Sequence, residues 1–171
     1  TEGDPYLING TNAEMLAELQ AINHNSSTLG STYYKLTSDI DASATAGWNS
    51  GTGFVPIGTG QSTFQNGGFD GSNKSISRIY INNTTAGVNV GIFGEVYESK
   101  INNLELTGAK ITGSNRVGGI IGNLGGNINV DNLQALENLH VDGDISGASD
   151  TGGIIGYAED VSDVRADTLR F

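Results

Sequence analysis

Two acidic residues of this chain are candidates for metal binding. Asp142 and Asp144 flank Gly143, at an expected corner between two strands. Calcium prefers carboxylate oxygens, so this pair is a candidate site for a structural calcium ion. The sequence contains neither an EF-hand loop nor a calcium-binding nonapeptide array. Only the preference of calcium for carboxylate oxygens therefore supports this assignment. The alternative is a solvated acidic surface that opposes aggregation.

Three aromatic residues are candidates for ligand binding. Trp48, Tyr33 and Tyr34 lie in the first 70 residues, where most of the aromatic side chains of the chain occur. Large aromatic faces suit the CH groups of carbohydrates. The alternative is that these side chains fill an irregular junction between an N-terminal helix and the first strands, because aromatic residues bury a large area.

The residue types needed for catalysis do not form a recognisable set. His24 and His140 are far apart in the sequence, and no G-x-S-x-G motif accompanies them. Lysine and arginine, which stabilise the developing charge in a lyase site, are few and scattered. We therefore expect no enzymatic activity, and no cofactor beyond the candidate structural calcium.

The composition narrows the range of partners. The net charge is −11, from 19 acidic and 8 basic residues, so binding to nucleic acid is not expected. The chain has no cysteine, which excludes disulfides, and no apolar run of the roughly 18 residues that a membrane span needs. No signal peptide is visible at the start, so the signal of a secreted protein would lie outside this sequence or have been removed.

Repeats marked by glycine organise the second half of the chain. The aligned segments are ISRIYINNTTAGVNVGIFG, INNLELTGAKITGSNRVGGIIG and LENLHVDGDISGASDTGGIIG. This alignment puts Ile76, Ile101 and Leu136 at one position. Each unit is expected to form three short strands, the last of them VGGIIG, that make one coil of a parallel β-helix. A β-sandwich of hairpins is the alternative, but the similar length of the units favours stacked coils.

The N-terminal part is expected to cap these coils. Helical spacing of apolar residues predicts a helix over residues 11–25, with Thr11 or Asn12 as its N-cap. Its apolar stripe would cover the open end of the first coil. We therefore expect an N-terminal strand and capping helix in residues 1–33 and β-solenoid coils in residues 34–171. The last coil begins at Val161 and is incomplete, as in a fragment of a longer chain.

The order of several segments resembles one protein family. YLINGTNAEMLAELQAI, YYKLTSDIDAS, FVPIG, STFQNGGFDGSNKSISRIYI and VGIFG follow one another as in the N-terminal part of bacterial GLUG-repeat surface proteins. These are filamentous-haemagglutinin-like adhesins and IgA-protease-associated repeat regions, and VGGIIG is similar to the GLUG motif itself. The resemblance implies an all-β fold, a right-handed parallel β-helix (β-solenoid) of about four coils, with no catalytic residues.

The resemblance also implies a location and a role. We expect a structural or adhesive module of a secreted or cell-surface bacterial protein, exposed at the exterior of the outer membrane. Its partner would be a host or matrix surface, including glycans. The alternative function is a carbohydrate-binding or polysaccharide-degrading β-helix. The incomplete coil at the C-terminal end, VSDVRADTLRF, also predicts self-association through an open strand edge.

Overall fold

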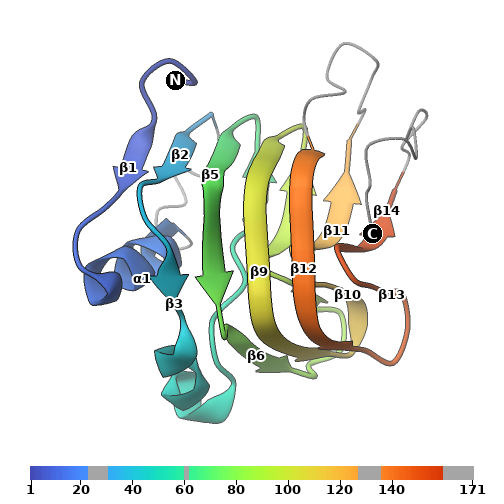
Figure 1. Cartoon of the computed structure of the whole chain (residues 1–171). Coiled ribbons are helices and arrows are strands. Elements are labelled where there is room, and N and C mark those ends of the chain that lie inside the picture. Colours follow the sequence, from blue (N-terminus) through green and yellow to red (C-terminus); the bar gives the residue numbers. More distant parts are fainter. Residues whose placement is uncertain (23–30, 60–61, 127–135, 160–171) are drawn as a thin grey trace.

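The computed structural model describes residues 1–22, 31–59, 62–126 and 136–159 of the chain (Figure 1). Its strands form three sheets, which we name A, B and C, and every ladder between these strands is parallel. Sheet A contains β1 (Tyr6–Ile8), β2 (Tyr33–Leu36), β3 (Ile40–Asp41), β5 (Gly68–Ser77), β6 (Tyr80–Asn83), β9 (Lys100–Gly113) and β12 (Leu136–Ser146). Sheet B contains β4 (Phe64–Gln65), β8 (Phe93–Tyr97), β11 (Ile121–Gly125) and β14 (Ile155–Ala158). Sheet C contains β7 (Asn89–Val90), β10 (Asn115–Gly118) and β13 (Thr151–Gly152). The prediction of an all-β fold is therefore confirmed.

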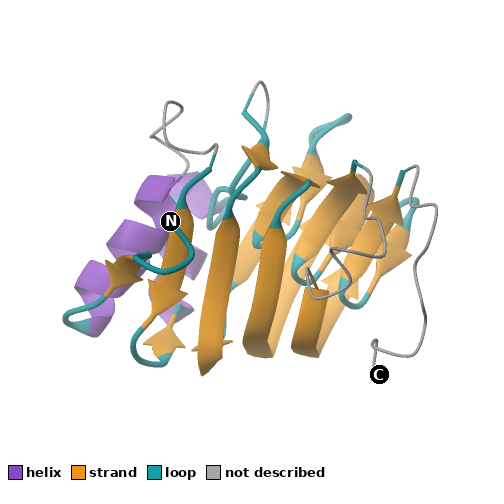
Figure 2. Ribbon diagram, turned by 90° about the horizontal axis from the view of Figure 1, so that it is seen from above, coloured by secondary structure: helices purple, strands orange, loops and turns teal. Residues whose placement is uncertain are grey.

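The chain visits the three sheets in a repeating order. From β5 and β6 in sheet A it passes to β7 in sheet C and β8 in sheet B, and then returns to sheet A as β9 beside β5. The same order recurs in β9, β10 and β11, and again in β12, β13 and β14. We call one circuit of the chain through sheets A, C and B a pass. Each pass lies beside the one before it, as Figure 2 shows from above.

The alignment of the apolar positions at the start of the second and third repeat units is confirmed by the strand register, although Gly143 lies opposite Ala109 and not opposite Gly108. Ile101 lies opposite Leu136, and Leu104 lies opposite Leu139, on the neighbouring strands β9 and β12. The side chain of His140, the next residue on β12, is exposed, as its place between two apolar residues predicts. The repeats of these two units therefore correspond to successive passes of the chain.

The alignment of the first repeat unit is wrong. Ile76 lies opposite Leu106 and not opposite Ile101, whose partner is Phe69. The register between β5 and β9 shifts between Asp70 and Lys74, where the backbone has positive φ angles. This irregularity adds residues to β5, so counting apolar positions assigns the strand to the wrong place.

The glycine-rich motif VGGIIG was predicted to be one strand, and it is instead a corner. β10 ends at Gly118 and β11 begins at Ile121, so the motif turns the chain from sheet C to sheet B. A Cβ atom on Gly118 would lie 2.0 Å from the carbonyl oxygen of Ile121 and 2.7 Å from that of Ile154. Glycine is therefore needed because the corner of one pass packs closely against its own backbone and that of the next.

Aromatic rings fill the space between sheets A and B. The Phe93 ring lies 5.1 Å from the Phe64 ring and 5.3 Å from the Phe69 ring, measured between centroids. The Tyr34 ring continues this cluster at 6.3 Å from Phe64. All four residues are buried. For the phenylalanines near the N-terminal end, a role in the core is therefore the correct interpretation.

The N-terminal helix α1 (Asn12–Ala21) begins as predicted. Thr11 is its N-cap and forms a capping box with Glu14, in which each side chain accepts a hydrogen bond from the backbone of the other residue. The predicted apolar stripe, Met15, Leu16, Leu19 and Ile22, is buried. The helix ends at Ala21, and the last three residues of the predicted range lie outside the described residues. Among the described residues, no helix is long and apolar enough to cross a membrane.

Two side-chain amides attach this helix to the backbone of strand β3 and to that of the loop around Val55. Asn12 donates to the carbonyl oxygen of Asp41 at 2.9 Å and accepts from its backbone N–H at 2.6 Å. Gln20 forms the same pair of bonds with the backbone of Val55, at 3.1 and 2.9 Å. An amide side chain offers one donor and one acceptor, as a neighbouring strand would. The helix therefore covers one end of the stack and satisfies backbone groups there (Figure 2).

Replacing Asn12 with alanine should destabilise the protein by about 2 kcal/mol, because both backbone groups of Asp41 lose their partner. Chemical unfolding in urea measures this loss. Asn12→Asp keeps an acceptor but no donor, and should fall between the two. Equal stability of all three proteins would show that the amide does not support the strand edge.

A candidate binding groove on sheet A

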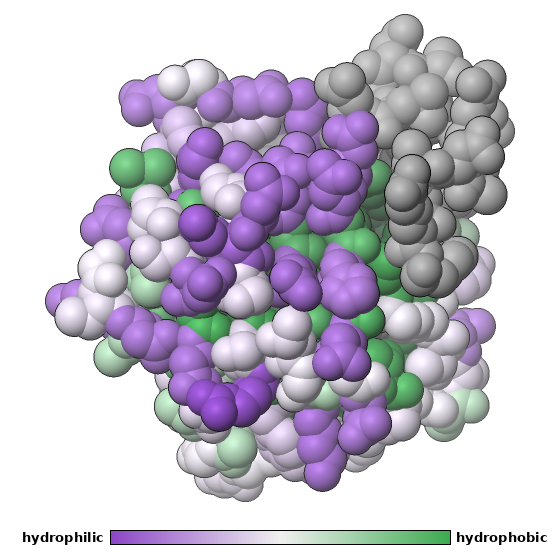
Figure 3. All heavy atoms as spheres, viewed as in Figure 1, coloured by the Kyte–Doolittle hydropathy of each residue, from purple (hydrophilic) through white to green (hydrophobic). Residues whose placement is uncertain are grey.

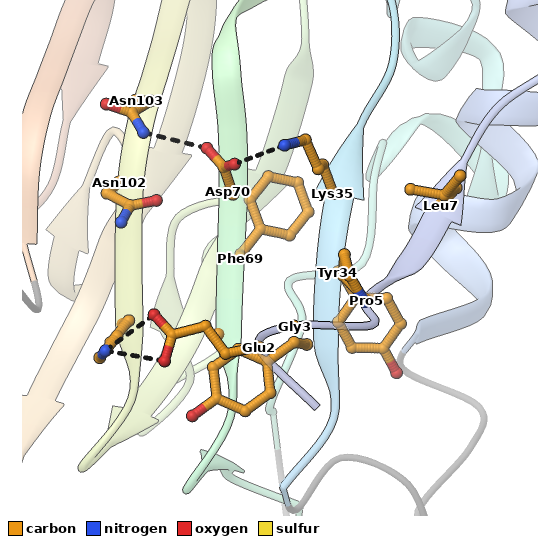
Figure 4. Close-up of a pocket in the computed structure, with 13 residues that line it drawn as sticks. Glu2, Gly3, Pro5, Leu7, Tyr34, Lys35, Phe69, Asp70, Asn102 and Asn103 are labelled. Carbon is orange, nitrogen blue, oxygen red and sulfur yellow. Dashed lines mark hydrogen bonds and ion pairs between the residues drawn. The ribbon is translucent and has the colours of Figure 1, made fainter.

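A groove of about 470 Å³ lies on the outer face of sheet A. It runs over strands β1, β2, β5 and β9, and residues 2–5, which we name the N-terminal arm, border it (Figure 4). In Figure 3, which looks onto this side of the molecule, hydrophilic side chains cover much of the surface and apolar ones show between them. We name this hollow the sheet A groove. Its lining residues are Glu2, Gly3, Pro5, Leu7, Tyr33, Tyr34, Lys35, Gly68, Phe69, Asp70, Lys100, Asn102 and Asn103.

The floor of the groove follows from the register of three parallel strands. Side chains alternate between the two faces of a strand, so aligned positions form rows across the sheet. One outer row is Tyr33, Gly68 and Lys100, and the next is Lys35, Asp70 and Asn102. The row between them, Tyr34, Phe69 and Ile101, points into the core and is buried.

A polar network crosses four strands at one side of the groove. The Lys35 ammonium lies 3.4 Å from the Asp70 carboxylate, which also accepts a hydrogen bond from the Asn103 amide at 3.0 Å (Figure 4). The Asn138 amide in turn donates to Asn103 at 2.9 Å. Asn103 and Asn138 both have positive φ angles, which asparagine tolerates better than most residues. Equivalent asparagines therefore stack from β9 to β12.

This network sets the protonation of Asp70. Burial by itself raises the pKa of Asp70, but hydrogen bonds from Asn103 and from Ser72 outweigh it. Together with the contact to Lys35, they hold the pKa of this carboxyl below its ordinary value. Asp70 is therefore a carboxylate at neutral pH, fixed in place as a hydrogen-bond acceptor.

Lowering the pH should reduce the free energy of unfolding, partly because the Asp70 carboxylate becomes protonated. A lowered folded-state pKa contributes stability that is present above the ordinary value of 3.8 and is lost as the pH falls below it. Asp70→Asn should remove that part of the pH dependence, at most about 1 kcal/mol because the group is partly solvated. Urea unfolding at a series of pH values measures it. The same acid dependence in both proteins would contradict this assignment.

The N-terminal arm contacts the far side of the groove. The Glu2 carboxylate accepts two hydrogen bonds from the Lys100 ammonium, at 2.9 and 3.1 Å. Glu2 comes from the arm, and Lys100 opens strand β9, 98 residues later. The Glu2 side chain remains 64% exposed and that of Lys100 34% exposed. This ion pair therefore lies at the open rim of the groove.

The structure separates the three aromatic candidates. Tyr33 and Tyr34 both line the groove, but the Tyr34 ring lies in the core and only Tyr33 lies in an outer row. Trp48 is not among the lining residues. It lies between two short 3₁₀ turns, Ser43–Gly47 and Asn49–Gly51, and is half-buried against the core. Of the three, Tyr33 is the residue placed to contact a ligand in this groove.

The two candidate calcium ligands lie elsewhere. Asp142 and Asp144 are exposed on β12, on either side of Gly143, at a register irregularity within the strand and not at a corner. Lys110 lies opposite Asp144 on β9, and a neighbouring cation disfavours calcium. Within the described ranges, no group of three or more His, Cys, Asp or Glu side chains is placed to hold a metal ion. Structural calcium at this pair remains a prediction.

Most of the polar residues of the groove were not predicted. Glu2, Lys35, Asp70, Lys100 and Asn102 come from four separate segments of the chain. One signal was present, because Lys35, Asp70 and Asn102 each follow a core residue of an aligned row. Reading that signal requires the correct alignment of the first repeat unit.

The fold and the groove together describe a mostly β module of three parallel sheets with a polar hollow on its outer face. Comparison with known proteins finds similarity to Halomucin of Haloquadratum walsbyi (strain DSM 16790 / HBSQ001), with 38% identity over 170 residues. The match covers 98% of this chain and 2% of Halomucin. No family model matches the chain, and no solved structure matches it.

Proposed function

We propose that this chain is a structural or adhesive module of a secreted or cell-surface protein. The observation that carries this proposal is the match to Halomucin, which extends over 98% of the chain but only 2% of the relative. Such a match is what one module of a very long protein would give. It supports a surface location, in agreement with the role implied by the resemblance to repeat-containing surface proteins.

The module is a right-handed parallel β-helix in this proposal. Three passes through sheets A, C and B place parallel strands side by side, as successive coils do. The hand follows from a general preference, because crossovers between parallel strands of one sheet are nearly always right-handed. Coils of this kind are stabilised mainly by stacking on their neighbours, which suits a long array of similar modules.

A structural role is also favoured over polysaccharide cleavage. A glycosidase needs a carboxylic acid whose raised pKa lets it protonate the leaving group. Asp70, the carboxylate in the floor of the groove, has a lowered pKa and three hydrogen-bonding partners. It is therefore suited to hold a ligand and not to donate a proton.

Immunolabelling tests the proposed location. An antibody raised against the purified chain should label intact cells of the organism that encodes it, because the module is exposed outside the cell. The same antibody applied to permeabilised cells gives the total signal, and an antibody to a cytoplasmic protein gives the background. Labelling that appears only after permeabilisation would overturn the proposal.

A further inference from the structure

We propose that the sheet A groove binds an acidic saccharide, whose carboxylate takes the place of Glu2 on Lys100. This goes beyond the structural role of the module, because it assigns a ligand class to one face of it. Three observations carry the assignment: an internal carboxylate on Lys100, an aromatic face in the same row, and in the next row a side-chain amide without a hydrogen bond to any described residue.

The first observation is the partner of Lys100. Both oxygens of the Glu2 carboxylate contact its ammonium, so the rim of the groove already holds a carboxylate in this structure. That carboxylate is on the arm and largely exposed, whereas the other lysine of the groove, Lys35, pairs with Asp70 within the sheet. The chain carries a net charge of −11, so an anion needs a local cation to approach it. Lys100 provides that cation once Glu2 moves away.

The second observation is the position of Tyr33. A Cβ atom on Gly68 would lie 2.6 and 2.8 Å from two carbon atoms of the Tyr33 ring, so the ring extends over the glycine. Lys100 is the next residue in this row. A sugar ring on this surface would place CH groups near the aromatic ring and its carboxylate near the lysine. The groove volume of about 470 Å³ is in the range of small-ligand sites, roughly 300–1,000 Å³.

The third observation is the Asn102 side chain. It points toward the groove from the next row, and its amide forms no hydrogen bond with any residue that the structure describes (Figure 4). An amide donates and accepts, so it matches sugar hydroxyl groups. Asp70, beside it in the row, presents a fixed acceptor. A sugar ring with hydroxyl groups and a carboxylate uses all of these groups and also packs against the Tyr33 ring, which a peptide of glutamates leaves without a partner.

Calorimetric titration of the full chain tests the proposal with a galacturonic acid trisaccharide and the neutral galactose trisaccharide. The acidic sugar should bind and the neutral one should bind at least about tenfold more weakly, because a hydrogen bond to a charged group contributes that much or more. Glu2→Gln should tighten binding of the acidic sugar, because it removes the internal competitor. Tyr33→Ala should weaken binding of both sugars.

Matched lysine variants separate the site from the general charge of the protein. Lys100→Met should weaken binding of the acidic sugar about tenfold. Lys110→Met makes the same charge change at an exposed position of the same strand, outside the groove, and should leave binding unchanged. Circular dichroism of each variant checks that it is folded.

Three results would overturn the proposal. The first is no binding of the acidic sugar by either the original chain or Glu2→Gln. The second is an equal effect of the two lysine variants. The third is binding of a tri-glutamate peptide without binding of the acidic sugar. Each of these leaves the surface location untouched, because immunolabelling tests that separately.

Discussion

Gly119→Ala should destabilise the protein by about 3 kcal/mol, because the added methyl group has no room between two passes of the chain. A Cβ atom at this position would lie 2.4 Å from the carbonyl oxygen of Gly153 and 2.7 Å from a methyl group of Val141. The first of these is backbone, which cannot rotate away as the end of a side chain can. Urea unfolding of the variant and the original chain measures the difference.

Gly153→Ala is the matched control for this substitution. Gly153 occupies in TGGIIG the place that Gly119 has in VGGIIG, but no described atom lies within 4 Å of its Cβ position. Its substitution should therefore change the free energy of unfolding by about 0.5 kcal/mol or less. Equal losses at the two positions would mean that the glycines of this motif are required by the turn itself and not by the stacking of passes.

Phe93→Ala should cost about 4 kcal/mol of stability, because it leaves a cavity among aromatic rings. Phe93 is fully buried and contacts both Phe64 and Phe69, so one ring connects the cores behind sheets A and B. The surrounding strands are tied by parallel ladders and have little freedom to close the space. Thermal and urea unfolding both measure the effect.

Tyr97→Ala is the control on the same strand, β8. The Tyr97 side chain is 42% exposed, so its loss removes little buried area and should cost far less than the loss of Phe93. Phe93→Leu, which refills most of the volume, should fall between them. If Phe93→Ala were no more destabilising than Tyr97→Ala, the aromatic cluster would not be a main source of stability.

The local parts of this fold were predictable from the sequence. A capping box, with Glu14 three residues after Thr11, and apolar residues at helical spacing predict α1, because both signals lie within a few turns of helix. The apolar positions at the start of the second and third repeat units align correctly because β9 and β12 contain similar residues in the same order. Parallel strands in an all-β fold followed from these repeats.

The groove was not predictable in the same way. It depends on which residues of β2, β5 and β9 lie opposite one another, and the irregularity between Asp70 and Lys74 changes that register. A shift of one residue exchanges the buried and exposed faces of a strand. An error in alignment therefore assigns the groove residues to the wrong face, and the site is not predicted. The contact between Glu2 and Lys100 spans 98 residues and has no local signal at all.

Successive passes of the chain lie side by side in parallel register, and cross-linking of cysteine pairs tests this arrangement. The chain has no cysteine, so pairs can be introduced without interference. Lys110→Cys with Asp144→Cys joins exposed positions that lie opposite each other on β9 and β12, about 4.8 Å apart between strands. The control pair is Glu105→Cys with Asp144→Cys. Glu105 lies opposite His140, four residues before Asp144, so this pair is offset along the same strands. With a short bifunctional maleimide, the first pair should link rapidly within one molecule and the second slowly. Equal rates for the two pairs, or links only between molecules, would show that β9 and β12 do not lie side by side in this register.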